Sequence, residues 1–300
     1  MLNYFLSIIV LNYQITMVDS LPVNQLIDRF VNASNEYKKN NIWLRGLDIV
    51  NSDPFFATKT IFSNMDYREN ISCFRIPSIV NSDNNIMVLT EARLFNCSDC
   101  SQKGIVSKTS ADNGLTWSDM KWVVPPGQVA ANPTSVYDDH NKKIILHYAT
   151  GKTNLSGKLD CVPSSDNWQV ESRDFGITWS KPYNISGFLG IHRGLLPGPG
   201  NGFQIKSNGR ILIPGHYGTA ERNYGHVITY YSDDYGITWN TSNNLFPFQD
   251  EATIALIQDN ILLLNMRNGH NNNSCKCRSI SRSFNNGLDW TPLEYDPKIK

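Results

Sequence analysis

The chain has 300 residues, and its 27 lysine and arginine residues are balanced by 27 aspartate and glutamate residues, so the formal net charge is zero. This balance gives no electrostatic reason to expect nucleic acid or an anionic membrane as the main partner. Hydrophobic residues make up 40% and charged residues 18%, which is typical of a globular chain and excludes a disordered chain, a collagen and a coiled coil.

The first twenty residues contain a short apolar run. Residues 4–11, with the sequence YFLSIIVL, are too few to span a bilayer but match the apolar core of a secretory signal peptide. Val18 and Ser20 would be the small residues before a cleavage site, although no Lys or Arg lies at the extreme N-terminus. We predict that residues 1–20 form a signal peptide, and the alternative is a buried first strand.

A helical pattern follows. Apolar residues recur at helical spacing from Val23 to Val31, directly after Pro22, which suits the first turn of a helix. The pattern predicts a short helix over residues 21–38, within an N-terminal extension of residues 21–45 that packs on the edge of the next domain.

An eight-residue motif then recurs within residues 46–300. Its intact copies begin at Ser110, Ser172 and Ser232, and a degraded copy begins at Ser283. The intact copies share an Asp, a Gly and a Trp, which are Asp112, Gly114, Trp117, Asp174, Gly176, Trp179, Asp234, Gly236 and Trp239. The Asp can accept backbone hydrogen bonds, the Gly permits a positive φ and the Trp can pack into a core, so the motif predicts a structural turn.

Short β-rich runs precede each copy, and others lie between copies, as at residues 143–149 and 209–214. The copies begin 62, 60 and 51 residues apart, and several short strands in a unit of this length are typical of a β-propeller blade. The sequence therefore predicts an all-β propeller with about four blades in residues 46–300.

Six cysteines offer no metal site by their spacing. Cys97 and Cys100 form a Cys-X-X-Cys pair, but no second pair or histidine lies at zinc-ligand spacing, and a redox motif would need a βαβ context. We expect structural disulfides or buried thiols, and neither a metal nor a cofactor.

Three further motifs follow one another in a family-specific order. They are FRIPS at residues 74–78, EAR at residues 91–93, and DEAT at residues 250–253 with LNMRN after it. With the repeated turn, which resembles the Asp box, they resemble the sialidase (neuraminidase) family over residues 70–297. GH at residues 215–216 and PGPG at residues 197–200 look most similar to its lysosomal members. The resemblance implies a six-bladed β-propeller, here incomplete.

Arginines are the expected ligands of the substrate, because sialic acid carries a carboxylate. A guanidinium group binds a carboxylate through two hydrogen bonds and stays charged at any working pH. The resemblance implies that Arg75 and Arg267 are two of the three arginines that bind this carboxylate, and that Arg93 is a neighbouring pocket arginine. We expect residues 74–80 to form an inner strand that points Arg75 toward the centre, with the Asp boxes on the opposite side.

Two carboxylates have expected catalytic roles by the same resemblance. Asp99 would be the general acid, kept protonated by its surroundings, and Glu251 would be the base that activates a tyrosine nucleophile. His147, His192 and His216 could line the pocket, but a structural or surface role is the expectation for each.

The resemblance also implies residues that we do not identify. Family members carry the third arginine and the nucleophilic tyrosine late in the chain, whereas this sequence stops at Lys300. Tyr295 belongs to the segment before those blades. We therefore expect a C-terminally truncated or degenerate chain with an unclosed propeller.

The implied function is that of an exo-α-sialidase that releases terminal sialic acid from glycoproteins, oligosaccharides and gangliosides with retention, weakly in this chain. An inactive sialic-acid-binding lectin is the alternative, and a binding propeller of the sorting-receptor kind would make the FRIPS motif a coincidence. The expected partners are sialylated glycans and a lysosomal protein, without nucleic acid, and the expected location is the lysosome or the secretory pathway.

Overall fold

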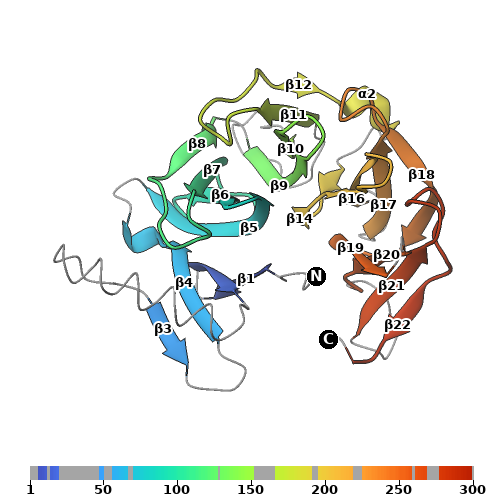
Figure 1. The fold of residues 1–300 in the computed structure, drawn as a ribbon, viewed down its shortest axis with the longest axis horizontal. Coiled ribbons are helices and arrows are strands. Elements are labelled where there is room, and N and C mark those ends of the chain that lie inside the picture. Colours follow the sequence, from blue (N-terminus) through green and yellow to red (C-terminus); the bar gives the residue numbers. More distant parts are fainter. Residues whose placement is uncertain are drawn as a thin grey trace.

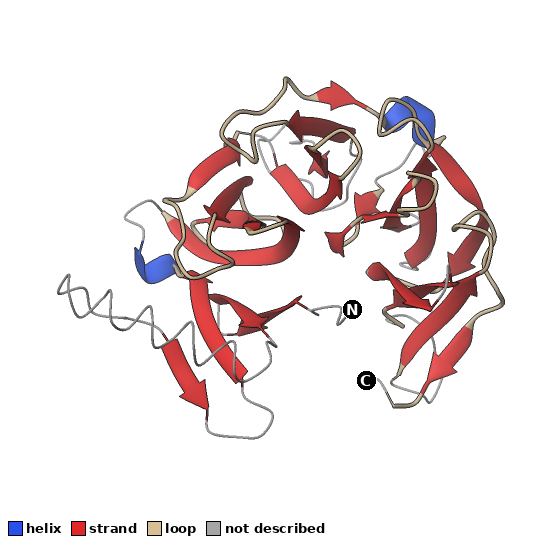
Figure 2. Ribbon diagram, viewed as in Figure 1, coloured by secondary structure: helices blue, strands red, loops and turns tan. Residues whose placement is uncertain are grey.

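A computed structural model describes most of the chain. The described residues are 6–11, 14–19, 47–50, 56–66, 70–127, 129–151, 166–190, 195–218, 225–258, 261–268 and 277–298. They form five β-sheets, and four of these stand around a common centre as the blades of a propeller (Figures 1 and 2). No helix in these ranges is long and apolar enough to cross a membrane. The predicted all-β propeller with about four blades is confirmed.

The first two blades are formed by consecutive strands. Blade 1 has the order β5 (Ile71–Ser82), β6 (Asn85–Leu94), β7 (Lys103–Ser110) and β8 (Lys121–Val124). Blade 2 has β9 (Val129–Asp138), β10 (Lys143–Gly151), β11 (Asn167–Ser172) and β12 (Tyr183–Asn184), and β14 (Gly200–Asn201) adds to it in parallel beside β9.

The last two blades follow after the short helix α2 (Ser186–Leu189). Blade 3 joins β13 (Leu196–Pro197), β15 (Phe203–Gln204), β16 (Ile211–Gly218), β17 (Gly225–Ser232) and β18 (Asn240–Pro247). Blade 4 has β19 (Ala252–Gln258), β20 (Ile261–Met266), β21 (Arg278–Ser283) and β22 (Glu294–Asp296).

The burial of each strand follows its place in a blade. The second strands, β6 and β10, are buried over nearly their whole length, because neighbouring blades cover both faces. The outer strand β18 alternates instead between exposed and buried residues, as expected for a strand with one face in solvent.

All four Asp-box copies form the turn between the third and fourth strands of a blade. In the third copy, Asp234 Oδ1 accepts the Thr238 N–H at 2.9 Å and Asp234 Oδ2 accepts the Thr238 hydroxyl at 2.6 Å, while Gly236 has φ +88°. In the degraded copy the side chains at the same two positions are also hydrogen-bonded, but the donor is now the first of them. Asn285 Nδ2 donates to Asp289 Oδ2 at 2.8 Å. The predicted structural turn is confirmed.

The N-terminal residues add a fifth sheet, in the order β1 (Leu6–Leu11), β2 (Gln14–Asp19), β4 (Phe56–Phe62) and β3 (Leu47–Val50). The apolar run predicted as a leader thus forms strand β1, which matches the alternative of a first strand, and its cleavage stays a prediction. The 3₁₀ turn η1 (Asn64–Asp66) leads from β4 toward β5. The predicted helix over residues 21–38 lies outside the described residues, and the domain boundaries stay predictions.

Candidate active site

The segments with the family motifs meet on one face of the propeller. Strand β7 begins at Lys103 beside the cavity described below and ends at Ser110, the first residue of an Asp box. Strand β21 likewise ends at Ser283, in the fourth copy. The cavity and the Asp boxes therefore lie at opposite ends of the blades, as predicted.

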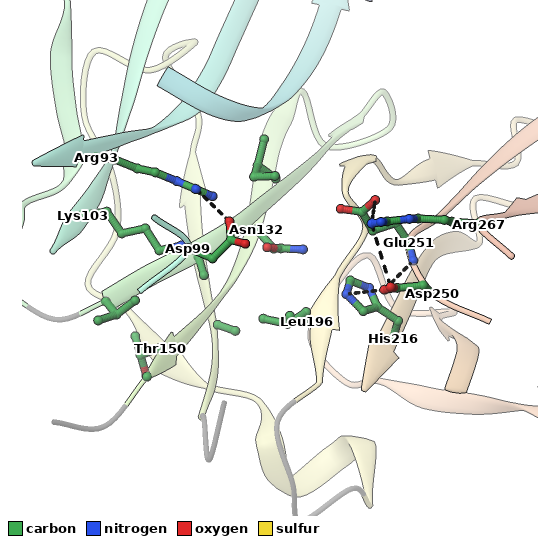
Figure 3. Close-up of a pocket in the computed structure, with 15 residues that line it drawn as sticks. Arg93, Asp99, Lys103, Asn132, Thr150, Leu196, His216, Asp250, Glu251 and Arg267 are labelled. Atoms are coloured by element: carbon green, nitrogen blue, oxygen red, sulfur yellow. Dashed lines mark hydrogen bonds and ion pairs between the residues drawn. The ribbon is translucent and has the colours of Figure 1, made fainter. Parts of the chain in front are cut away.

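A cavity of about 290 Å³ lies at this face, between blades 1 and 4. One wall carries Arg93, Asp99 and Lys103, and the facing wall carries His216, Asp250, Glu251 and Arg267 (Figure 3). Small apolar residues of blade 2 and Leu196 line the space between the two walls. Four of the five predicted site residues therefore line one cavity, and the fifth, Arg75, lies beside it.

Arg93 is fixed on the first wall by a fully buried carboxylate. Its Nε and Nη2 atoms lie 2.8 and 2.7 Å from Glu91 Oε2, and Lys103 Nζ lies 3.1 Å from the same oxygen. The other oxygen, Glu91 Oε1, accepts the N–H of Asn132 at 3.0 Å. Glu91 is 0% exposed and Arg93 only 1%. Each buried charge thus has partners, which is the condition for burying it at all.

Asn132 extends this network across the base of the cavity. Its side-chain Nδ2 donates to the carbonyl of Pro197 at 3.1 Å, which connects blade 2 to β13 of blade 3. The residue has φ +54°, a left-handed conformation that Asn tolerates better than most residues. The sequence motifs did not identify Asn132 or Lys103, and Glu91 was noticed only as part of the EAR motif.

Asp99 projects from the β6–β7 loop toward both arginines. Its Oδ1 atom lies 2.7 Å from Arg93 Nη1 and 3.9 Å from Arg75 Nη1. Burial raises the pKa of Asp99, but the charge and hydrogen bond of Arg93, with the charges of Arg75 and Lys103, outweigh this effect and lower it. The surroundings therefore favour the ionised carboxylate, which differs from the expectation that they keep it protonated.

A disulfide fixes the start of this loop. Cys97 is bonded to Cys73 of β5, and Arg93 Nη1 donates to the Cys97 carbonyl at 2.9 Å. Cys100 and Cys277 are disulfide-bonded as well. The described cysteines therefore follow the prediction of structural disulfides.

Arg75 emerges from an irregular point of β5, the inner strand of blade 1. The register with β6 shifts between Arg75 and Ser78, and Ile76 has φ +57°, which is strained for a β-branched residue. Thr90 Oγ1 donates to the Arg75 carbonyl at 2.7 Å and holds the bulge against β6. The Arg75 side chain remains 46% exposed beside Asp99. A bulge that re-aims a side chain is typical of functional sites.

Glu251 and Arg267 form an exposed pair on the second wall. Arg267 Nη1 lies 3.1 Å from Glu251 Oε2, and the Arg267 side chain is 55% exposed. Their backbones are also joined, because the Arg267 N–H donates to the Glu251 carbonyl at 2.8 Å and the Asp250 N–H donates to the Arg267 carbonyl at 2.9 Å.

Two histidines behave differently from each other. His147 is buried in the core between Gln169 and Tyr230, and burial lowers its pKa to about 4, so the expected structural role is confirmed. His216 lines the cavity instead, and burial lowers its pKa against the opposing charges of Asp250 and Glu251. His192 lies outside the described residues.

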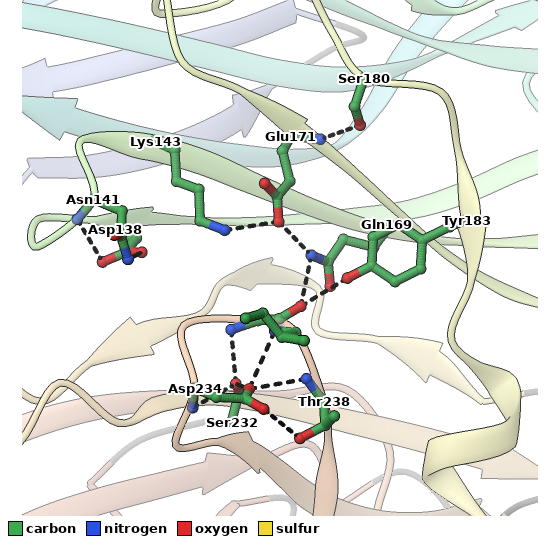
Figure 4. Close-up of polar contacts among 12 residues, drawn as sticks. Asp138, Asn141, Lys143, Gln169, Glu171, Ser180, Tyr183, Ser232, Asp234 and Thr238 are labelled. Carbon is green, nitrogen blue, oxygen red and sulfur yellow. Dashed lines mark hydrogen bonds and ion pairs between the residues drawn. The ribbon is translucent and has the colours of Figure 1, made fainter.

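A second charged cluster, between blades 2 and 3, is fully used in packing (Figure 4). Lys143 Nζ lies 2.8 Å from Glu171 Oε1, which also accepts from Gln169 Nε2 at 2.9 Å. Gln169 Nε2 and Tyr183 OH donate to the carbonyl of Gly236 in the third Asp box, at 3.0 and 2.7 Å. These contacts join neighbouring blades. No three potential metal ligands of the His, Cys, Asp or Glu type gather anywhere in the described ranges.

Comparisons with known proteins agree with this fold. Residues 125–298 match the family described as BNR repeat-like domain. The chain belongs to the sialidase family. A sialidase of Bacteroides fragilis is 26% identical over 253 residues, which cover 77% of this chain and 45% of that protein. A sialidase of Clostridium perfringens is 25% identical, over 76% of this chain and 63% of its own length. The chain thus spans about half the length of these sialidases.

A solved structure supports the fold. The Hadza microbial sialidase Hz136 superimposes with a TM-score of 0.65 at 23% identity, over 74% of this chain and 46% of the other. At this identity the likeness establishes the sialidase-type propeller, while the roles of individual residues depend on the geometry of the cavity.

Proposed function

We propose that the cavity binds the sialic acid end of a sialylated glycan, and that its residues are those of an exo-α-sialidase. One observation carries the proposal. Asp99 and Glu251, the expected acid and base, lie more than 150 residues apart in the sequence but line the same cavity, each next to an arginine.

Substrate binding would be electrostatic. Among the residues that the structure describes, Arg75 and Arg267 have half-exposed guanidinium groups near the cavity, so both have donors available for a substrate carboxylate. Arg93 is held in place by Glu91 and would contact the sugar with little loss of side-chain entropy.

Asp99 would acquire its proton only when the substrate is bound. A bound carboxylate would offset the charge of Arg75, and the sugar would exclude water from the carboxyl group. Both effects raise the pKa of an acid. Asp99 would then protonate the leaving oxygen, on the opposite side of the cavity from Glu251, the proposed base.

The described residues that line the cavity include no tyrosine for Glu251 to activate. We therefore propose that this chain binds sialic acid and hydrolyses sialosides only weakly. This observation also favours the second candidate function, a sialic-acid-binding lectin. The disulfides support a location in the secretory pathway or the lysosome, where sialylated glycoproteins and gangliosides occur, and a lysosomal protein partner remains a proposal.

Calorimetric titration of the full chain with methyl α-sialoside tests the proposal. Arg75→Ala should weaken binding about ten-fold or more, because one charge-assisted hydrogen-bonding group is lost. The control is Arg282→Ala, since Arg282 pairs with Glu294 on the outer strands of blade 4. Equal affinity of the wild type and Arg75→Ala would contradict the proposed site.

Hydrolysis separates the two candidate functions. A fluorogenic aryl sialoside should be cleaved weakly or not at all by the wild type, although methyl α-sialoside binds. Strong turnover that depends on Arg75 would reject the lectin and require a nucleophile within residues 1–300.

A further inference from the structure

The ring of His216 lies between two hydrogen-bond acceptors on the second wall. Its Nδ1 atom is 3.2 Å from the carbonyl oxygen of Gly198, and its Nε2 atom is 3.4 Å from Asp250 Oδ1. The side chain is only 10% exposed, so water has little access to the ring nitrogens. Figure 3 shows His216 and Asp250 beside each other below Glu251 and Arg267.

These two contacts indicate how many protons the His216 ring carries. A carbonyl oxygen only accepts, so the contact with Gly198 requires a proton on Nδ1. A neutral imidazole has one N–H, and Nε2 would then turn a lone pair toward the Asp250 carboxylate. Two acceptors at 3.4 Å repel, whereas an imidazolium donates to the Gly198 carbonyl and is attracted by the charge of the Asp250 carboxylate. The geometry therefore suits a protonated His216 opposite an ionised Asp250.

Asp250 also contacts both members of the proposed functional pair, Glu251 and Arg267. The oxygen that faces His216 also accepts the N–H of Glu251 at 2.9 Å, and the other oxygen lies 3.9 Å from Arg267 Nη1. The orientation of the Asp250 carboxylate therefore bears on Glu251 and Arg267 directly, while His216, on β16, is anchored to the neighbouring blade.

We propose that His216 and Asp250 are positioning residues, and that a proton on His216 Nε2 holds Asp250 in the orientation that supports Glu251 and Arg267. This inference rests on the proposed function of that pair. When the proton leaves, the two facing acceptors repel each other and Asp250 loses its ion pair with His216 of blade 3. Neither residue touches the reacting atoms in this proposal.

The direction of the pH dependence follows from the charges around the ring. Burial is the largest effect and disfavours the protonated ring, as does Arg267, whereas Asp250, Glu251 and the Gly198 carbonyl favour it, so the pKa of His216 is lowered from 6.5. In the described strands that pair with β16 on either side, Leu196 and Val227 lie opposite His216, and neither residue is charged. Arg93, Asp99 and Lys103 face it only across the cavity. The proton is therefore bound at acidic pH and lost as the pH rises toward neutrality.

The ¹⁵N resonances of histidine-labelled full chain test the inference without any ligand or turnover. We expect neutral His216 to carry its proton on Nδ1, the less common tautomer, and to gain the Nε2 proton on acidification. Asp250→Asn should lower the pH midpoint of His216, because the carboxylate that favours the imidazolium is gone. A proton on Nε2 in the neutral ring, or an unchanged midpoint in Asp250→Asn, would overturn the inference.

Binding of methyl α-sialoside across the same pH range gives the functional readout. The wild type should bind about ten-fold more weakly once His216 is neutral, as expected for the loss of one charge-assisted contact. His216→Gln should bind weakly with a flatter pH dependence, whereas the control His140→Gln, which changes a ring stacked on Tyr235 far from the cavity, should match the wild type.

The two proposals can fail separately. If no sialoside binds at any pH, the proposed function fails, while the tautomer and the pH midpoint of His216 still test the contact between His216 and Asp250. If the sialoside binds equally at all pH values through the His216 transition, the proposed function stands and the positioning role is overturned.

Discussion

The two walls of the cavity are built in opposite ways. On the first wall Arg93 and Lys103 are buried against Glu91, which has donors on both oxygens. On the second wall the side chain of Arg267 is more than half exposed and contacts the side chain of Glu251 at 3.1 Å. The difference indicates that the first wall is preorganised before the substrate arrives, whereas the second can exchange its internal ion pair for contacts with the substrate.

The largest expected effect is on the free energy of unfolding, which should depend more on the ion pairs of the first wall than on exposed pairs. Glu91→Gln leaves two buried cations without their carboxylate, and removing one partner of a buried pair costs about 3–5 kcal/mol in the free energy of unfolding. Urea denaturation followed by near-ultraviolet circular dichroism measures this loss.

The matched control for that variant is Glu294→Gln, which breaks the exposed pair with Arg282 and should cost at most about 1 kcal/mol. If both variants lose the same stability, the first wall is not the rigid element described above.

The next effect is a loss of affinity for methyl α-sialoside without a loss of stability, and we expect it for a substitution on the second wall. Arg267→Ala should change the free energy of unfolding by less than about 1 kcal/mol, because its ion pair is exposed. The same variant should bind methyl α-sialoside about ten-fold or more weakly, because a charged donor to the carboxylate is removed. A variant that unfolds easily but binds normally would reverse the assignment of the two walls.

The smallest expected effect is a change in the pKa of Asp99, the exposed residue of the first wall. Partial desolvation raises its pKa in the free protein, but the charge and hydrogen bond of Arg93, with the charges of Arg75 and Lys103, outweigh this and lower it. Binding of methyl α-sialoside should raise that pKa, and ¹³C-carboxyl chemical shifts of labelled aspartate measure the change, with Asp99→Asn for assignment. A pKa that stays unchanged or falls on binding would argue against the role of Asp99 as an acid.

The sequence predicted the parts of the molecule that depend on local pattern. The Asp-box turns form as expected, because Asp, Gly and Thr satisfy the turn within a few residues of each other. Asp99, in the β6–β7 loop, and Glu251, directly before β19, also reach one cavity, because both segments lie on the same side of the propeller.

Contacts between distant segments could not be predicted in this way. Lys103 and Asn132 join Glu91 from positions 12 and 41 residues away, and no periodicity marks a buried ion pair. His216 meets Asp250 only because blades 3 and 4 are adjacent. Residues 4–11 remained ambiguous because an apolar run of this length suits both a leader and a strand.

The most direct test asks whether both walls hold the same sugar. The arginine side-chain N–H resonances of the full chain can be followed while methyl α-sialoside is added, with Arg93→Lys and Arg267→Lys for assignment and Arg282 as the distant reference. We predict that the resonances of Arg93 and Arg267 shift along one saturation curve with a single Kd, while that of Arg282 stays in place. A shift of Arg267 alone, or separate saturation of the two resonances, would contradict a single site between the two walls.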